Sequence, residues 1–104
     1  QEEIGHAFLA EGNGYGGVIS IIVGLDKDLA VKDISIVSQT ETPGLGSMIT
    51  EDSFTQQFIG LSAQEIELSS SGGKIDSISG ATISSEAVTS AVRQAMEEKI
   101  KSIK

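Results

Sequence analysis

The stretch VISIIVGLDKDLAVKDISIVS, residues 18–38, holds two patterns that together predict a β-hairpin. Its first part, Val18 to Val23, is rich in β-branched residues and is typical of a buried strand. Its last part, Val31 to Ser38, alternates isoleucines with polar residues, as a strand with one buried face does. The polar residues Asp26-Lys27-Asp28 between these parts favour a turn. We therefore expect two antiparallel strands joined by a tight connection.

Outward from this hairpin, the sequence predicts further short elements and one long helix. Glu51 to Ile59 has apolar residues at helical spacing and is followed by a glycine, which predicts a short helix. Alternation over Gln64 to Ser69, and a short run over Lys74 to Ile78, predict two more strands on either side of the turn Ser71-Gly72-Gly73. From about Ser84 to the C-terminus one apolar face recurs, which predicts a long helix.

These elements define the expected fold class. The chain has 104 residues, 38% of them hydrophobic, which suits one globular domain over residues 1–104. Short strands in hairpin order with two helices predict an α+β fold, in which a mainly antiparallel twisted sheet carries packed helices, including a long C-terminal one. The regular βαβ alternation of a dinucleotide-binding fold is not found.

Charge and composition exclude several classes of function. Seven Lys and Arg residues against 15 Asp and Glu residues give a net charge of -8, so we expect no nucleic-acid partner. Without cysteine the chain has no disulfide, thiolate metal site or Fe–S cluster, and we predict no metal site. The single histidine, His6, has no catalytic partner at a recognisable spacing. No segment has the length of a membrane span or the pattern of a signal peptide, so either the protein is soluble or an anchor has been removed.

Two short motifs resemble ligand sites but lack the context that those sites need. Gly12, Gly14 and Gly17 fit GxGxxG, yet a β-branched strand follows where a nucleotide site needs a helix, so we favour a glycine-rich hairpin turn. Asp26 and Asp28 lack the rest of a calcium-binding loop, and we interpret them as a solvated turn.

Two other stretches, SGATISS at 79–85 and TETPGLG at 40–46, are stronger candidates for a site. Small residues before a helix let a ligand approach the backbone, and the free amides of a helix start attract anions such as phosphate. On spacing alone a second interpretation is open, in which Ser84 or Ser85 simply caps the helix. The proline and glycines of the second stretch predict a loop of defined shape.

The first of these stretches also carries a family resemblance. DSISGAT, Asp76 to Thr82, resembles the pattern D-x-x-(S/T)-G-A-T of the FMN-binding domain found in the G subunit of Rnf electron-transport complexes and the C subunit of the sodium-translocating NADH:quinone reductase. GYGG with a β run, ETPGLG, a Phe-containing helix ending at Gly60 and this motif follow in the family's order. The resemblance covers the chain from Gly14 to about Val92.

The resemblance implies roles for particular residues. Thr82 would carry FMN through a phosphoester bond, within a sequence that a flavin transferase recognises through Asp76, Ser79, Gly80 and Ala81. The loop expected to lie against the flavin comprises Glu41, Thr42, Pro43, Gly44, Leu45 and Gly46. Family members often have a histidine two residues before this glutamate, where this chain has Gln39.

The implied function is electron transfer. The resemblance predicts a domain with covalent FMN, partnered by other subunits of a membrane ion-translocating redox complex of the Rnf type and matured by a flavin transferase. It would be held at the extracytoplasmic face of the cell membrane by an anchor absent from this chain, and would not turn over NADH alone. A flavin-binding sensor or regulatory domain, and an acidic interaction module without cofactor, are the alternatives.

Overall fold

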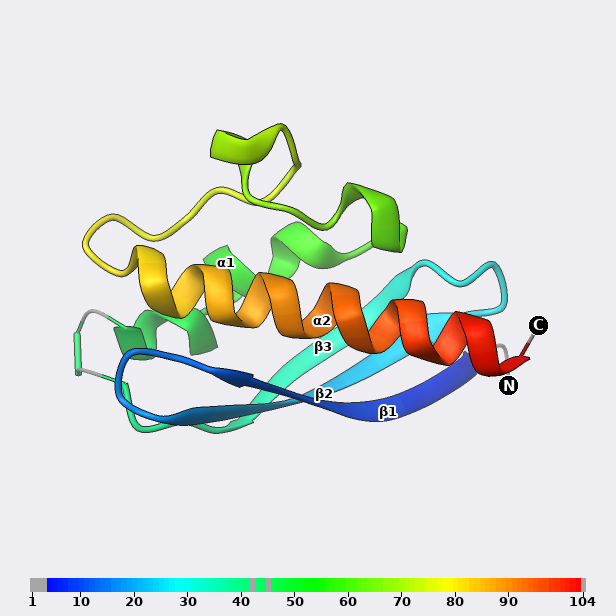
Figure 1. The fold of residues 1–104 in the computed structure, drawn as a ribbon, viewed down its shortest axis with the longest axis horizontal. Coiled ribbons are helices and arrows are strands. Elements are labelled where there is room, and N and C mark those ends of the chain that lie inside the picture. Colours follow the sequence, from blue (N-terminus) through cyan, green and yellow to red (C-terminus); the bar gives the residue numbers. More distant parts are fainter. Residues whose placement is uncertain (1–3, 42, 45, 104) are drawn as a thin grey trace.

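A three-stranded antiparallel sheet and one long helix form the frame of the molecule. The computed structural model describes residues 4–41, 43–44 and 46–103. Its sheet has the order β1-β2-β3, with β1 at Ile4–Asn13, β2 at Val18–Asp26 and β3 at Val31–Ser38. Helix α2, Thr82–Ile103, lies across one face of the twisted sheet (Figure 1). The predicted α+β class is therefore confirmed.

The predicted hairpin is also confirmed, because β2 and β3 pair antiparallel. In the turn between them the Asp26 carboxylate accepts hydrogen bonds from the backbone N–H of Asp28 at 2.8 Å and of Ala30 at 3.1 Å. Residues 14–17 form the expected glycine-rich turn, closed by the Gly14 N–H, which donates to the Gly17 carbonyl at 2.8 Å.

Strand β1 was not predicted. It pairs with β2 along almost its whole length, with Leu9 opposite Ile22 and Glu11 opposite Ser20. The four residues 7–10, AFLA, are all apolar, so the period-two pattern that marks a half-buried strand is hidden. In the structure Ala10 faces the core at 3% exposure, whereas Leu9 on the opposite face is 54% exposed.

The core lies between the sheet and α2. One face of β2 and one face of α2 supply its centre, and every side chain in this central set is fully buried: Ile19, Ile21, Val23, Leu25, Val88, Val92 and Met96. Near the start of the helix Gly12 allows a close approach between β1 and α2. A Cβ there would lie 2.7 Å from the Ala87 carbonyl oxygen and 3.0 Å from the Ala91 Cβ.

Between β3 and α2 the chain is made of short helical pieces and loops. In order these are η1 (Gly46–Thr50), α1 (Asp52–Thr55), η2 (Gln56–Phe58), η3 (Ala63–Glu65) and η4 (Ser69–Ser71). The helix predicted from Glu51 to Ile59 is present as α1 followed by the tighter turn η2. Both η1 and η3 contact α2, and the light green to yellow part of Figure 1 lies on the side of the helix away from the labelled strands.

The strands predicted at Gln64 to Ser69 and Lys74 to Ile78 are wrong. A capping box, in which Ser62 and Glu65 bond each other's side chain and backbone, starts η3 where the first strand was expected. The two segments share only one bridge, Leu68 to Ile75. The alternation has another cause, because the apolar side chains of both segments enter the core while their backbones stay irregular.

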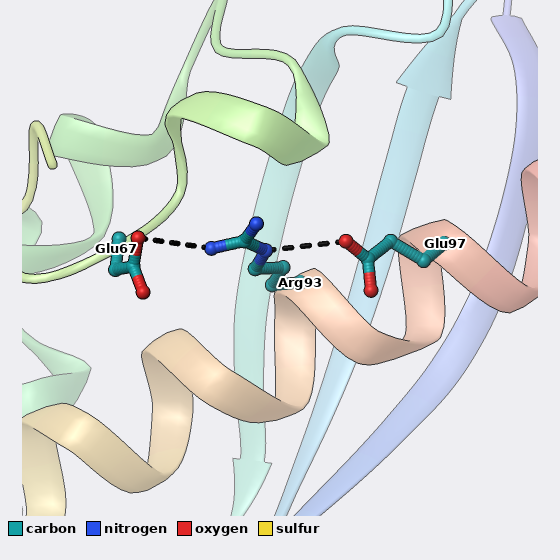
Figure 2. A network of polar contacts seen from close by, with 3 residues as sticks. All are labelled: Glu67, Arg93 and Glu97. Carbon is teal, nitrogen blue, oxygen red and sulfur yellow. Dashed lines mark hydrogen bonds and ion pairs between the residues drawn. The ribbon is translucent and has the colours of Figure 1, made fainter.

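Helix α2 begins at Thr82 rather than at about Ser84. From Ala87 to Ile100 the side chains of its predicted apolar face are buried or partly buried. On its outer side Arg93 pairs with Glu67 of the preceding segment and with Glu97 one turn further along the helix (Figure 2). None of the helices in the described residues has the length and apolar content that crossing a membrane requires.

Candidate functional site

A pocket of about 470 Å³ lies at the N-terminal end of α2. Three separate parts of the chain form it, namely the turn between β1 and β2, the loop after β3, and the start of α2 with the residues just before it. This volume lies within the range of small-molecule and cofactor sites. The residues that line it are Tyr15, Gly46, Gly80, Ala81, Thr82, Ile83 and Ser84.

The start of α2 presents backbone donors to this pocket. The Ser85 N–H donates to the Ala81 carbonyl at 3.0 Å, which is the first helical hydrogen bond of α2. The amides of Thr82, Ile83 and Ser84 come before it and have no carbonyl of their own helix to bond. All three residues line the pocket. These amides and the positive end of the helix dipole favour an anionic group such as phosphate.

The hydroxyl groups at this helix start differ in their availability. Ser85 is fully buried, and its Oγ donates to the Ala81 carbonyl at 2.8 Å and accepts from the Ile78 N–H at 2.9 Å. Ser84 is also buried and donates to the Glu41 carboxylate. Thr82, in contrast, is exposed on the pocket. The interpretation of Ser84 or Ser85 as the helix cap is wrong, because both lie inside the first turn and bond elsewhere.

The segment before α2 reaches the helix through a fixed turn. Gln57 binds the backbone of Asp76 twice, accepting from its N–H at 2.7 Å and donating to its carbonyl at 3.1 Å. The Ala81 N–H donates to the Ile78 carbonyl at 2.9 Å and closes a turn in which Gly80 has a φ of 81°. Residues with a side chain rarely adopt this left-handed conformation, so the turn requires its glycine.

Glu41 joins the three parts of the chain that form the pocket. Its carboxylate accepts hydrogen bonds from the N–H of Tyr15 at 2.7 Å, the N–H of Gly16 at 2.8 Å and the hydroxyl of Ser84. Burial by itself would raise the pKa of Glu41, but the bonds from Ser84, Gly16 and Tyr15 outweigh burial and lower that pKa below its ordinary value. The carboxylate is therefore ionised at neutral pH.

Residues 14–97 match the profile of a protein family, the FMN-binding domain. The chain belongs to this family. The G subunit of the proton-translocating ferredoxin:NAD(+) oxidoreductase complex of Clostridium ljungdahlii is 42% identical over 98 residues, covering 91% of this chain and 53% of the relative. The G subunit of the ion-translocating oxidoreductase complex of Methanosarcina acetivorans is 38% identical over 93 residues, covering 86% and 50%. The chain thus spans about half the length of the curated relatives it matches.

One solved structure has a fold similar to that of this chain. The crystal structure of the C subunit of the Na(+)-translocating NADH-quinone reductase from Parabacteroides distasonis aligns with a TM-score of 0.74 at 25% identity. The alignment covers 91% of this chain and 54% of that one.

Within this FMN-binding domain the residues of the DSISGAT motif divide into two groups. Gly80, Ala81 and Thr82 line the pocket. Asp76 and Ser79 are exposed and do not line it. A role for these two residues in recognition by a flavin transferase stays a prediction.

The residues of the ETPGLG loop also have different positions. Gly46 is buried and lines the pocket, whereas Pro43 and Gly44 are exposed and do not. Thr42 and Leu45 lie outside the described residues. The Glu41 side chain lies beneath the lining and bonds to protein groups, and its own N–H donates to the Gln39 side chain at 2.8 Å.

The sequence assigned no individual ligand-binding role to three lining residues, Tyr15, Ile83 and Ser84. Tyr15 and Ile83 are 73% and 55% exposed, so both present apolar surface beside the pocket. The sequence held a signal for Tyr15, because it is the one tyrosine of the chain and lies between glycines.

These features fit the cofactor for which the family is named. The amides of the helix start suit its phosphate, and the exposed apolar surfaces of Tyr15 and Ile83 suit a flat aromatic ring. Thr82 is exposed and lines the same pocket, at the helix start itself.

Proposed function

We propose that this domain carries FMN at the pocket, with the flavin phosphate esterified to the Thr82 hydroxyl. The observation that carries the proposal is the contrast among hydroxyls at one helix start. Ser84 and Ser85 are buried and bonded, whereas Thr82 is exposed on a pocket lined by the first residues of α2, whose amides have no carbonyl of their own helix to bond. The threonine is an anchor, because its oxygen is consumed in the ester and takes no part in turnover.

Attachment requires an activated donor, and a flavin dinucleotide balances the reaction. The bond between Thr82 Oγ1 and the flavin phosphorus forms while the pyrophosphate bond breaks. The nucleoside monophosphate leaves, and the hydroxyl proton passes to a base of the flavin transferase. In this domain the amides at the start of α2 would hold the phosphate, and the turn at Gly80 would leave Thr82 accessible to the enzyme. Asp76 and Ser79 would then lie on the surface that the transferase recognises.

A covalent bond suits the charge of the chain. With a net charge of -8, the domain has little long-range attraction for an anionic cofactor. The ester makes retention independent of that weak attraction. When bound, FMN supplies redox chemistry, while the protein supplies its position and surroundings.

We further propose that the domain transfers electrons as one part of a membrane redox complex of the Rnf type. Its relatives are named as subunits of ion-translocating oxidoreductase complexes, which supports this role. The other subunits would be its partners, and an anchor outside this chain would hold it at the extracytoplasmic face.

We expect the flavinylated domain to accept electrons from dithionite and pass them to artificial acceptors, with negligible NADH oxidation. Rapid, saturable NADH oxidation by the domain alone would contradict a carrier role.

The attachment site is tested by intact mass after co-expression with a flavin transferase. We expect the wild type to gain the mass of one FMN group and Thr82→Ala to gain none while keeping its far-UV circular dichroism. Thr50→Ala is the matched control, since Thr50 is also exposed but does not line the pocket. Covalent flavin on the Thr82→Ala variant would show that another residue is the attachment site.

A further inference from the structure

A buried carboxylate lies behind the proposed flavin pocket without lining it. Glu41 is 4% exposed, and its two oxygens accept from the Tyr15 N–H, the Gly16 N–H and the Ser84 hydroxyl. These donors are 26, 25 and 43 residues away in sequence. One side chain therefore ties the β1–β2 turn and the first turn of α2 to the loop after β3.

Two glycines make room for this carboxylate. A Cβ at Gly14 would lie 2.6 Å from Glu41 Oε1 and 2.8 Å from its Cδ. A Cβ at Gly46 would lie 2.6 Å from both the Glu41 Cβ and the Ser84 Oγ. Real Cβ atoms are essentially never this close to another heavy atom, so the glycines of the GYGG and ETPGLG motifs make room for the Glu41 side chain.

We propose that Glu41 is a positioning residue for the flavin, acting through Ser84 and the Tyr15–Gly16 backbone rather than by touching the cofactor. This inference rests on the proposed function. Tyr15 and Ser84 line two different walls of the pocket, and Glu41 fixes both. We do not expect Glu41 to touch the flavin, because both of its carboxylate oxygens already accept hydrogen bonds from protein donors. Direct contact would also place its negative charge next to an anionic cofactor.

The same bonds assign a second effect to Glu41. By accepting from Ser84 it holds that hydroxyl in the protein interior, so of the two hydroxyls in the first turn of α2 that line the pocket, Thr82 is the exposed one. Glu41 therefore leaves Thr82 available for attachment and makes Ser84, two residues further along the helix, unavailable.

The test compares Glu41→Gln with Glu65→Gln. Glu65 is the matched control, because its carboxylate also accepts from a backbone N–H and a serine hydroxyl, both of Ser62, but it does not line or support the pocket. Without flavin, Glu41→Gln should speed hydrogen exchange of the Tyr15 and Gly16 amides by about tenfold, as expected for a lost bond to a charged group. With flavin on Thr82, it should change the visible circular dichroism and midpoint potential of the cofactor, and Glu65→Gln should change neither.

Ser84→Ala is a milder variant that removes one of the three bonds, and we expect it to keep the fold even where Glu41→Gln does not. It should shift the flavin dichroism in the same direction as Glu41→Gln, and the two changes combined should be less than additive, because both remove one contact. Flavinylated Glu41→Gln and Ser84→Ala proteins with wild-type dichroism and potential would overturn the positioning role alone. A wild type that takes up no flavin would instead overturn the proposed function and, with it, this inference.

Discussion

The sheet with α2 and the segment from Gly46 to Ala81 are built in different ways. In the first region, periodic apolar residues on long elements meet face to face. In the second, the longest helical piece described has five residues, and its strand-like pairing consists of two bridges, Leu68 to Ile75 and Ile78 to Ala81. Yet both regions contribute fully buried side chains, because Ile49, Phe58, Ile66 and Ile75 are as inaccessible as the centre of β2.

The difference shows that burial and regularity are separate properties. The irregular segment satisfies its backbone partly through side chains, as where Gln57 binds Asp76 and Ser85 binds Ile78. Such a backbone can turn its small residues toward a ligand, which a packed helix face cannot. Two walls of the pocket, at Gly46 and at Gly80 with Ala81, accordingly belong to this segment.

The largest expected effect tests whether the two regions unfold together. Phe58 is fully buried, and its ring lies edge-to-face with that of Phe54 at 5.5 Å between centroids. We expect Phe58→Ala to lower the free energy of unfolding by about 3–5 kcal/mol, since it leaves a cavity in the shared core. Urea unfolding followed by the circular dichroism of α2 should show a single transition at a lower midpoint with an unchanged slope.

Phe8→Ala is the matched control for this prediction. Phe8 lies in β1 and is only partly buried, so its loss should be smaller. If Phe58→Ala left the dichroism transition in place while the amides of the irregular segment lost protection, the segment would be a separate unfolding unit.

An intermediate effect is expected at Glu41, which lies in the loop between these two regions and accepts a hydrogen bond from Ser84 of α2. The pKa of Glu41 is lower in the folded protein than its ordinary value of 4.5. A lowered pKa stabilises the folded state above the unfolded pKa, and this contribution disappears as the pH falls through the folded value. The wild type should therefore lose unfolding free energy on acidification below pH 4.5, and Glu41→Gln should lose less.

The measurement is the urea midpoint of both proteins over a series of acidic pH values. Glu65→Gln should show the same pH dependence as the wild type, which would show that the effect belongs to Glu41 and not to any hydrogen-bonded carboxylate. Parallel curves for the wild type and Glu41→Gln would mean that the carboxylate gains nothing from its donors on folding.

The same comparison explains what the sequence could predict. The β2–β3 hairpin and α2 were predictable because β2 is a run of β-branched residues, while β3 and α2 each carry a clear period. Strand β1 was missed because residues 7–10 are all apolar, and the strands expected at 64–69 and 74–78 were wrong because alternation there marks burial alone. Irregular backbone has no period, so sequence could not indicate its path.

The residues of the candidate site also differ in whether the sequence could predict their role. Thr82, Gly80 and Gly46 were accessible from contiguous motifs, and the structure places all three on one pocket. The bonds that join Glu41 to Tyr15 and Ser84 cross 26 and 43 residues, and no local pattern encodes contacts of that range. The glycines could be seen in the sequence, but the reason for them could not. They make room for a buried carboxylate at a point where the β1–β2 turn, the loop after β3 and the start of α2 meet.

The smallest expected effect concerns the ion pairs of Arg93 on the surface of the same two regions (Figure 2). Arg93 Nη1 lies 3.0 Å from Glu67 in the irregular segment, and Nε lies 3.2 Å from Glu97 within α2. The Arg93, Glu67 and Glu97 side chains are 31%, 48% and 49% exposed, so water and salt screen both pairs. Arg93→Met should lower the free energy of unfolding less than either change above, and added salt should shrink the difference from the wild type.

Glu67→Gln and Glu97→Gln separate the contributions of the two ion pairs. Only Glu67→Gln should speed exchange of the Ile75 N–H, which donates to the Glu67 carbonyl at 3.0 Å, because only that pair fastens the irregular segment to the helix. Equal exchange in both variants would mean that apolar burial alone holds the segment in place.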